Sequence, residues 1–244
     1  MDGHLDAIRA RIHSAENVVI HLGAELGVEW TLDQEDGGSI DDSVVTNAPE
    51  VIATPDTFRR DPARLWRWYL WRRDRIARAE APPWVEAVSR FRRPGRTLSV
   101  ITENVDGVLS GMGFDLLELH GNLWRTRCLG CNRVRHQGSI YADSLPPKCG
   151  HCMELLRPDV VLFGETLDSK TIDRAMRLAC STQVLVVAGT QGLVATSATM
   201  VTLAAENEVY VVDVDGEDIA PANSEQVDVS LRGACESLLM KLLG

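Results

Sequence analysis

Hydrophobic and polar positions alternate along the chain in a way that predicts helices and buried strands in turn. Leu5, Ile8 and Ile12 recur at helical spacing, and the apolar run Val18-Val19-Ile20 behind them predicts a buried strand. That strand leads into Gly23-Ala24. A strand that runs into a glycine turn is how dinucleotide sites begin, although such turns are common throughout α/β proteins.

A longer helix is predicted after Asp61-Pro62, with the aspartate as its N-cap and the proline at its first helical position. Its apolar positions continue through Ile76, and Pro82-Pro83 then ends it. Ser169 is expected to cap another helix, since a hydroxyl at this position accepts hydrogen bonds from the free N–H groups of the first turn.

Further apolar runs predict strands that are buried on both faces. The runs lie at 98–101, 184–188 and 209–214, and they alternate with helical stretches at 169–179, 196–206 and 232–243. This alternation indicates an α/β fold with a parallel sheet covered by helices on both faces. Residues 31–53 are polar and acidic, and we expect them to form a long loop of the functional or mobile kind.

Composition narrows the classes of protein to consider. The 244 residues are 45% hydrophobic and 25% charged, which fits one large soluble domain, or one domain with a small insert. No apolar run is long enough to cross a membrane, and the first residues lack the plan of a secretory signal, so a cytoplasmic location is expected. The net charge of −10 disfavours nucleic acid as a partner and suits a basic substrate better, such as a lysine-rich tail.

Four of the six cysteines form two close pairs. Cys128 and Cys131 make the first pair, Cys149 and Cys152 make the second, and 17 residues separate them. Each pair fits a turn that directs two thiolates at one ion, and two such turns complete a tetrahedron with no open position. The spacing therefore predicts a structural zinc site rather than a catalytic one.

Several longer motifs resemble the sirtuin family, in the same order along nearly the whole chain. They are Thr102 to Gly107 (TENVDG), Glu118 to Gly121 (ELHG), Leu156 to Glu165 (LRPDVVLFGE), the aromatic stretch at 61–73, Gly189-Thr190 and Leu231 to Gly233. Sirtuins cleave NAD and remove acyl groups from lysine side chains. The resemblance implies a Rossmann-like part at about 1–60, 82–124 and 157–244, beside a small helical and zinc-binding part at about 61–81 and 125–156.

The resemblance also implies roles for single residues. His120 would be the general base that takes a proton from a ribose hydroxyl, for which a pKa near neutrality is suitable. Asn104 and Asp106 would line the nicotinamide pocket and hold its water. Without the motif around it, His120 would be interpreted as a hydrogen-bonded core histidine.

The acyl-lysine substrate would lie along the last motif. Val160, Gly164 and Glu165 would offer backbone groups to the substrate strand, and Phe163 would form an apolar wall. The alternative for Phe163 is that it only packs within its own loop.

Tyr69 and Arg72 lie one helical turn apart, so their side chains reach the same side of the predicted helix. The pair resembles the acyl pocket of sirtuins that prefer succinyl- or malonyl-lysine, in which a guanidinium fork and a phenol hold a distal carboxylate. The alternative is an aromatic-rich core helix with surface arginines.

The cofactor loop departs from the family pattern. Where sirtuins have Gly-Ala-Gly, this chain has Gly23, Ala24 and Glu25, and acids at Glu35-Asp36 replace the usual Phe-Arg. At an effective dielectric of about 20, like charges about 4 Å apart repel by roughly 4 kcal/mol, a loss in affinity of about a thousandfold. We expect the Glu25 carboxylate to occupy the anion site and to accept the backbone N–H bonds meant for phosphate.

Other positions that the resemblance assigns to the cofactor also differ. Glu103 stands where the family has a ribose-binding Gln, and Gln191 replaces the Ser that follows Gly189-Thr190. Asp215 replaces an Asn near the adenosine ribose, where a carboxylate is acceptable chemistry.

Three functions therefore stay open at this point. The first is an NAD-dependent deacylase that acts on an acylated protein lysine or a small acylated molecule, with a preference for acidic acyl groups. The second is a catalytically inactive module that binds acyl-lysine or a partner. The third is an enzyme that uses the His120 pocket for different chemistry without NAD.

Overall fold

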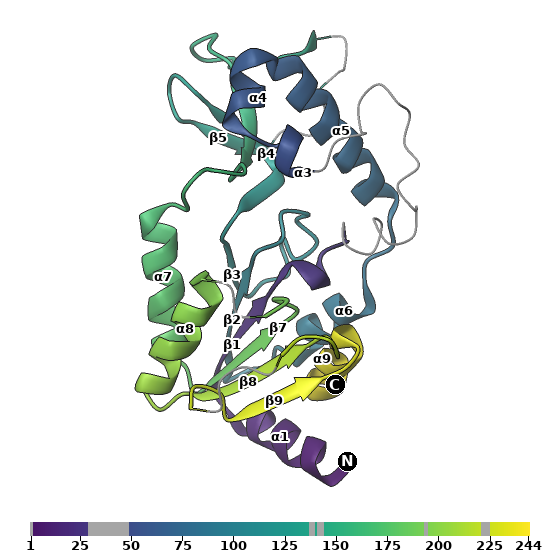
Figure 1. Ribbon diagram of the computed structural model, residues 1–244, viewed down its shortest axis with the longest axis vertical. Coiled ribbons are helices and arrows are strands. Elements are labelled where there is room, and N and C mark those ends of the chain that lie inside the picture. Colours follow the sequence, from purple (N-terminus) through teal and green to yellow (C-terminus); the bar gives the residue numbers. More distant parts are fainter. Residues whose placement is uncertain (1, 29–48, 137–139, 141–143, 193–194, 221–224) are drawn as a thin grey trace.

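The computed structural model describes residues 2–28, 49–136, 140, 144–192, 195–220 and 225–244, which form a large and a small lobe (Figure 1). The large lobe is built on a six-stranded sheet in the order β3-β2-β1-β7-β8-β9. Every neighbouring pair of these strands is parallel. The order is that of the doubly wound dinucleotide-binding fold. In this fold, ligands bind at the carboxyl ends of the strands, next to the point where the strand order reverses.

The four central strands of this sheet are mostly apolar because both faces are covered, whereas the edge strands β3 and β9 include polar residues. Their bounds are β1 (Asn17–Leu22), β2 (Thr97–Thr102), β3 (Asp115–Glu118), β7 (Val184–Ala188), β8 (Tyr210–Asp215) and β9 (Val229–Arg232). One face packs on α1 (Asp2–Ser14), α6 (Pro83–Phe91) and α9 (Cys235–Leu243), and the other on α7 (Ser169–Cys180) and α8 (Ala195–Glu206). The predicted parallel sheet with helices on both faces is confirmed.

The alternation of side chains along β1 shows how this arrangement is encoded. Val18, Ile20 and Leu22 enter the core on the side of α1, α6 and α9. Val19 enters the core on the side of α7 and α8. Successive side chains of a strand point to opposite faces, so an unbroken apolar run serves both layers.

The small lobe combines helices with a three-stranded antiparallel sheet in the order β5-β4-β6. Its elements are α3 (Pro49–Ile52), α4 (Pro55–Arg60), α5 (Pro62–Arg78), β4 (Gly121–Cys128), β5 (Val134–His136) and β6 (Leu156–Val160). The fully buried Trp66 ties α5 to this sheet, because its indole N–H donates to the carbonyl of Leu156 at 2.9 Å.

Arg73 fixes the same helix about two turns further along. Its side chain is only 5% exposed, and its Nε donates to the carbonyl of Leu123 at 2.5 Å. The guanidinium lies 5.7 Å from the ring of Trp66 and 5.8 Å from that of Trp124, and burial lowers its pKa to about 10. These contacts set the rotation of α5 and therefore the side from which its other residues project.

Local details confirm some sequence predictions and correct others. Asp61 caps α5 as predicted, accepting the N–H of Arg64 at 2.9 Å. The cap of α7 is Asp168 rather than Ser169, because the Asp168 carboxylate accepts the N–H of Thr171 at 2.9 Å and Ser169 is already helical. Residues 229–232 form strand β9, so the last helix begins at Cys235 and not at 232. Most of the predicted acidic loop, including residues 35 and 36, lies outside the described residues, and its described end forms α3.

Candidate active site

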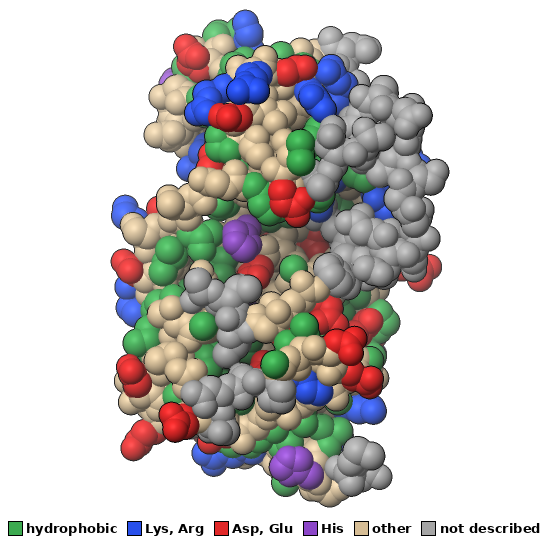
Figure 2. All heavy atoms as spheres, in the orientation of Figure 1, with side chains coloured by type: hydrophobic (Ala, Val, Ile, Leu, Met, Phe, Trp, Pro, Cys, Tyr) green, Lys and Arg blue, Asp and Glu red, His purple; other side chains and the backbone are tan. Residues whose placement is uncertain are grey.

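A cavity of about 560 Å³ lies between the two lobes. Figure 2 shows the molecule hollowed at this level, with a histidine and hydrophobic side chains gathered there. Eleven of the residues proposed from the sequence line it: Ala24, Tyr69, Arg72, Glu103, Asn104, Asp106, His120, Val160, Phe163, Gly164 and Glu165. The other proposed cofactor residues, Gly23, Glu25, Gly189, Thr190, Gln191 and Asp215, are not among those that line it.

His120 lies in the turn between β3 and β4 and lines the cavity. Its Nδ1 is 2.8 Å from the backbone carbonyl of Glu103. A carbonyl oxygen only accepts, so Nδ1 carries the proton and Nε2 is the nitrogen with the free lone pair in the neutral ring. This is the tautomer that a general base in the cavity needs.

Gly121 explains why the turn after His120 holds its shape. A Cβ at Gly121 would lie 2.1 Å from the carbonyl oxygen of Asp159, and the residue has φ +86°. Only glycine fits this close approach of β4 and β6. The carbonyl of His120 also accepts the N–H of Val161 at 2.9 Å. The substrate-side segment after β6 is therefore fixed directly to the histidine.

Asn104 and Asp106 both line the cavity, but their polar groups are largely engaged by backbone. Asn104 Nδ2 donates to the carbonyl of Gly23 at 3.0 Å. The buried Asp106 carboxylate accepts the N–H of Val28 at 3.0 Å and that of Val108 at 3.1 Å. Both side chains therefore hold the cofactor loop against the segment that follows β2.

Two polar residues that the sequence analysis did not single out lie beside Glu103. His21 of β1 is 0% exposed, and its Nε2 lies 3.2 Å from Glu103 Oε1. The buried Ser197 of α8 donates to the same oxygen at 3.1 Å. Burial works to raise the pKa of Glu103, but His21, His120 and Ser197 outweigh it and hold that pKa below its ordinary value. A histidine in an otherwise apolar strand was the only sequence signal for this cluster.

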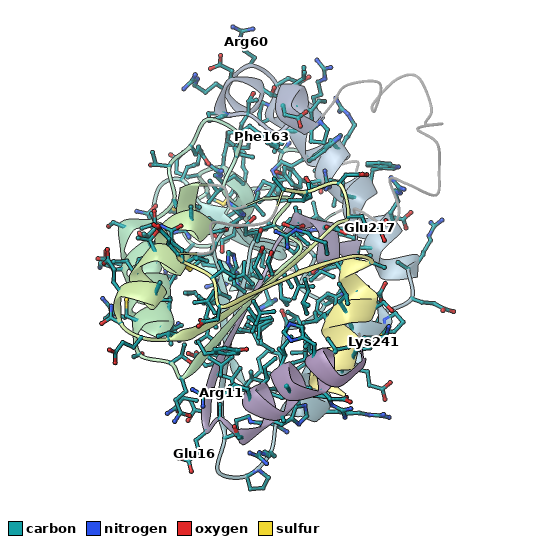
Figure 3. All side chains as sticks on the ribbon, turned by 60° about the horizontal axis from the view of Figure 1, so that its bottom comes forward. Arg11, Glu16, Arg60, Phe163, Glu217 and Lys241 are labelled. Atoms are coloured by element: carbon teal, nitrogen blue, oxygen red, sulfur yellow. The ribbon has the colours of Figure 1, made fainter. Side chains whose placement is uncertain are left out.

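The acyl side of the cavity is formed by α5 and the segment after β6. Tyr69 is buried, Arg72 is half-buried, and the Arg72 guanidinium lies 4.5 Å from the centre of the Trp68 ring. Phe163 is 49% exposed although it is apolar. In Figure 3 it lies below Arg60 of α4, toward the middle of the molecule. Phe163 also lines the cavity, and its role as an apolar wall for the substrate stays a prediction.

Glu165 shapes this segment through its side chain. Its carboxylate accepts two hydrogen bonds from the Arg157 guanidinium, at 2.6 and 2.8 Å, and a third from the N–H of Leu162 at 2.8 Å. Burial works to raise the pKa of Glu165, but Arg157 and Leu162 outweigh it and lower that pKa. The ion pair therefore closes the loop that carries Phe163 and Gly164.

Gly23 and Gly189 bring the ends of β1 and β7 into contact. A Cβ at Gly23 would lie 2.3 Å from the carbonyl oxygen of Gly189, so no larger residue fits without a shift of backbone. The N–H of Glu25 donates to the same carbonyl at 3.1 Å. These contacts lie at the carboxyl ends of the strands, where this type of fold has the crevice that binds ligands.

Glu25 lies beside Asp215 in this crevice, and its expected place at the anion site stays a prediction. Asp215, at the end of β8, accepts the N–H groups of Gln191 at 3.2 Å, Gly192 at 2.8 Å and Gly216 at 3.1 Å. Thr190 Oγ1 lies 3.4 Å from the same carboxylate. Within the described parts of the chain, the backbone donors therefore go to Asp215. Glu25 is hydrogen-bonded to Asp215 instead, and burial together with that negative neighbour raises its pKa.

Comparison with known proteins decides the family. A model of the Sir2 family matches residues 45–196. The NAD-dependent protein deacylase 2 of Pyrobaculum aerophilum is 39% identical over 201 residues, which cover 80% of this chain and 78% of that protein. The chain belongs to the Sir2 family. The NAD-dependent protein deacylase of Aquifex aeolicus is 37% identical over 171 residues, or 70% of this chain and 72% of that protein.

Solved Sir2 structures agree with this assignment. A Sir2 homologue in complex with NAD is 28% identical, with a TM-score of 0.79 over 98% of this chain and 92% of that one. A serine-to-alanine mutant of a Sir2 homologue in complex with ADP-ribose is 30% identical, with a TM-score of 0.79. The match covers 98% of this chain and 94% of that one. The resemblance to sirtuins drawn from the motifs is confirmed.

The metal site of this Sir2 chain lies in the small lobe. The sulfurs of Cys128, Cys131, Cys149 and Cys152 all lie within 4.8 Å of one another. A Zn–S bond of about 2.3 Å implies sulfur separations of about 3.8 Å in a tetrahedron, so the cluster fits zinc. Backbone N–H groups of His151 and Cys152 lower the pKa of the Cys149 thiol to about 6, which favours the thiolate that zinc binds. The cluster therefore provides the complete ligand set of a structural zinc site.

No helix among the described residues of this Sir2 protein is both long and apolar enough to cross a membrane.

Proposed function

We propose that this Sir2 protein is an NAD-dependent deacylase that acts on an acylated lysine side chain, in the cytoplasm. The observation that carries the proposal is the environment of His120. Its Nδ1 is bonded to the backbone of Glu103, and its other ring nitrogen remains for the cavity between the lobes. A base held in one tautomer beside a cavity suits proton removal from a sugar hydroxyl.

The crevice at the end of the sheet fits a dinucleotide. Gly23 and Gly189 bring bare backbone to its floor, and the buried Asp215 holds the loop after β7 by accepting the N–H of Gly192. When bound there, NAD would supply the sugar carbon that receives the acyl group. Ala24, Glu103 and Asn104, which line the cavity, would hold its nicotinamide half near His120.

The acyl group that fits best is an acidic one, such as succinyl or malonyl. Tyr69 and Arg72 both line the cavity from one side of α5. The Trp68 ring under the Arg72 guanidinium keeps that cation oriented and partly shielded from water. A shielded guanidinium and a phenol form charge-assisted hydrogen bonds with a carboxylate, but have no such partner on an acetyl group.

A second candidate function is a binding module that takes acyl-lysine without turnover. The Glu25 and Asp215 carboxyl pair supports it, because negative charge in the crevice disfavours a diphosphate. A third candidate is chemistry at the His120 cavity that needs no NAD. The experiment described next distinguishes the three functions.

The test is to incubate the protein with succinyl-lysine and acetyl-lysine peptides, with and without NAD, and to identify products by mass spectrometry. We expect nicotinamide, free lysine peptide and acyl-ADP-ribose only when NAD is present. His120→Ala should lower turnover by about 10²–10⁴-fold with little change in melting temperature, and His136→Ala, at an exposed position, should match the wild type. Peptide binding without turnover would favour the binding module, and deacylation without NAD would favour different chemistry.

A further inference from the structure

A buried polar cluster lies beneath the cavity, where β1, β2 and α8 meet. It consists of His21, Glu103 and Ser197, which come from three distant parts of the sequence. His21 and Ser197 are both 0% exposed. Side chains alternate along β1, so the ring of His21 lies on the same sheet face as Val19, among residues that otherwise pack against α7 and α8.

The contacts of Glu103 leave one of its oxygens for a ligand. His21 Nε2 and Ser197 Oγ both approach Oε1, at 3.2 and 3.1 Å. Glu103 lines the cavity, and its side chain is 11% exposed. Because both of these contacts with described residues fall on Oε1, Oε2 is the carboxylate oxygen that remains for the cavity.

His21 is not explained by packing alone. Within the described parts of the chain, neither of its ring nitrogens has a hydrogen-bond partner, although Nε2 is within ion-pair distance of Glu103. Buried polar groups in proteins are nearly always hydrogen-bonded, and an incompletely satisfied one points to a functional constraint. Catalytic hydrogen bonds are often poorly aligned before substrate binds and tighten in the complex.

We propose that His21 and Ser197 are positioning residues, which hold the Glu103 carboxylate so that Oε2 accepts a hydrogen bond from a hydroxyl of the sugar beside His120. The proposal rests on the proposed function, since it takes that sugar to be the distal ribose of the cofactor. An ionised carboxylate only accepts hydrogen bonds, so it recognises a free hydroxyl there. The His120 ring is bonded to the backbone carbonyl of the same Glu103, so both side chains act on one sugar.

The experiment compares two ligands by calorimetry: ADP-ribose, which has the distal ribose, and ADP, which lacks it. We expect His21→Leu to weaken ADP-ribose binding about tenfold or more, because the Glu103 carboxylate is no longer held toward the distal ribose, and to change ADP binding by less than about twofold. In a Glu103→Gln background, the same substitution should change ADP-ribose affinity by less than about twofold. Ser197→Ala should follow the same pattern with a smaller loss of ADP-ribose affinity, about threefold. This variant provides the test if His21→Leu does not fold.

Val19→Ala is the matched control, since Val19 is buried on the same strand and the same face. It should lower the melting temperature, and it should change the affinities for ADP and for ADP-ribose by the same factor. Equal losses for ADP and ADP-ribose in His21→Leu, or the same loss in both backgrounds, would mean that His21 only packs and would overturn the proposal. If the wild type performs NAD-dependent deacylation while showing no such coupling, this proposal alone fails. A wild type that binds neither ligand overturns the proposed function and this inference together.

Discussion

The carboxyl group of Glu25 is hydrogen-bonded to that of Asp215, at the point where β1 and β8 end. A neighbouring negative charge disfavours the ionised form of a carboxyl group and therefore raises its pKa. Asp215 is fully buried, and its carboxylate accepts three backbone N–H groups. Glu25 is the member whose pKa is raised, and its protonation state sets the charge of the crevice.

The first prediction concerns cofactor affinity. We expect the wild type to bind NAD weakly, and Glu25→Gly to strengthen binding at least about tenfold, because it removes both bulk and negative charge near the diphosphate. Glu25→Gln separates the two effects, since it removes only the charge. Wild-type affinity should also improve with added salt and with falling pH, as the repulsion is screened or the Glu25 carboxyl is protonated.

Titration calorimetry with NAD checks this prediction. Glu217→Gln is the control, since Glu217 is an exposed acid near the same edge of the sheet (Figure 3). It should leave affinity unchanged within about twofold. Tight binding by the wild type that neither Glu25 variant nor salt changes would show that the Glu25 side chain does not affect the cofactor.

The second prediction concerns stability and pH. The fold raises the pKa of Glu25 above its ordinary value of 4.5, so the folded state binds this proton more tightly than the unfolded state does. The stability linked to Glu25 is therefore fully present below about pH 4.5 and is lost as pH rises through the raised pKa. We expect Glu25→Gln to melt at a higher temperature than the wild type at about pH 8, with the difference shrinking toward pH 4.5.

Melting curves of the wild type and of Glu25→Gln, recorded between about pH 4.5 and pH 8, test this prediction. A difference in melting temperature that is the same at every pH would mean that the substitution acts through packing and not through ionisation. Loss of stability in Glu25→Gln at about pH 8 would mean that the ionised carboxylate is stabilising in the fold.

The third prediction concerns acyl preference. Arg72→Met keeps the apolar stem and removes the guanidinium, so we expect succinyl-lysine turnover to fall by more than about tenfold while acetyl-lysine turnover changes by less than about threefold. Arg75→Met is a closely matched control. Arg75 lies 4.7 Å from the centre of the Trp71 ring, much as Arg72 lies over Trp68, but it does not line the cavity. Steady-state kinetics on both peptides give the ratio, and equal losses on the two substrates would make Arg72 structural.

The fourth prediction concerns the metal. We expect about one zinc ion per chain in freshly purified protein, and removal by a chelator should melt the small lobe, because the metal holds together the two turns that carry the four cysteines. Elemental analysis and a melting curve with and without chelator are the measurements. Cys180→Ser, outside the cluster, should keep its zinc, whereas Cys149→Ser should lose it. Less than about half a zinc per chain would contradict a structural site.

Much of the fold and part of the site follow from local sequence. The apolar runs at 98–101 and 184–188 correctly predicted strands β2 and β7, because a strand that is buried on both faces is hydrophobic along its whole length. The two cysteine pairs were also predicted, since the members of each pair are only three positions apart. The cap of α7 was placed one residue late, because aspartate and serine both serve as caps and stand side by side here.

The sequence by itself determined which elements form and which residues have the chemistry for a site, because periodicity and short spacing are local properties of the chain. Only the tertiary structure decided how those residues pair. The strand order brought Asp215 beside Glu25 and to the backbone N–H groups of the loop after β7. It also placed His21 and Ser197 on the carboxylate of Glu103. Such contacts join residues far apart in the chain, and they depend on register and strand order, which no local pattern specifies.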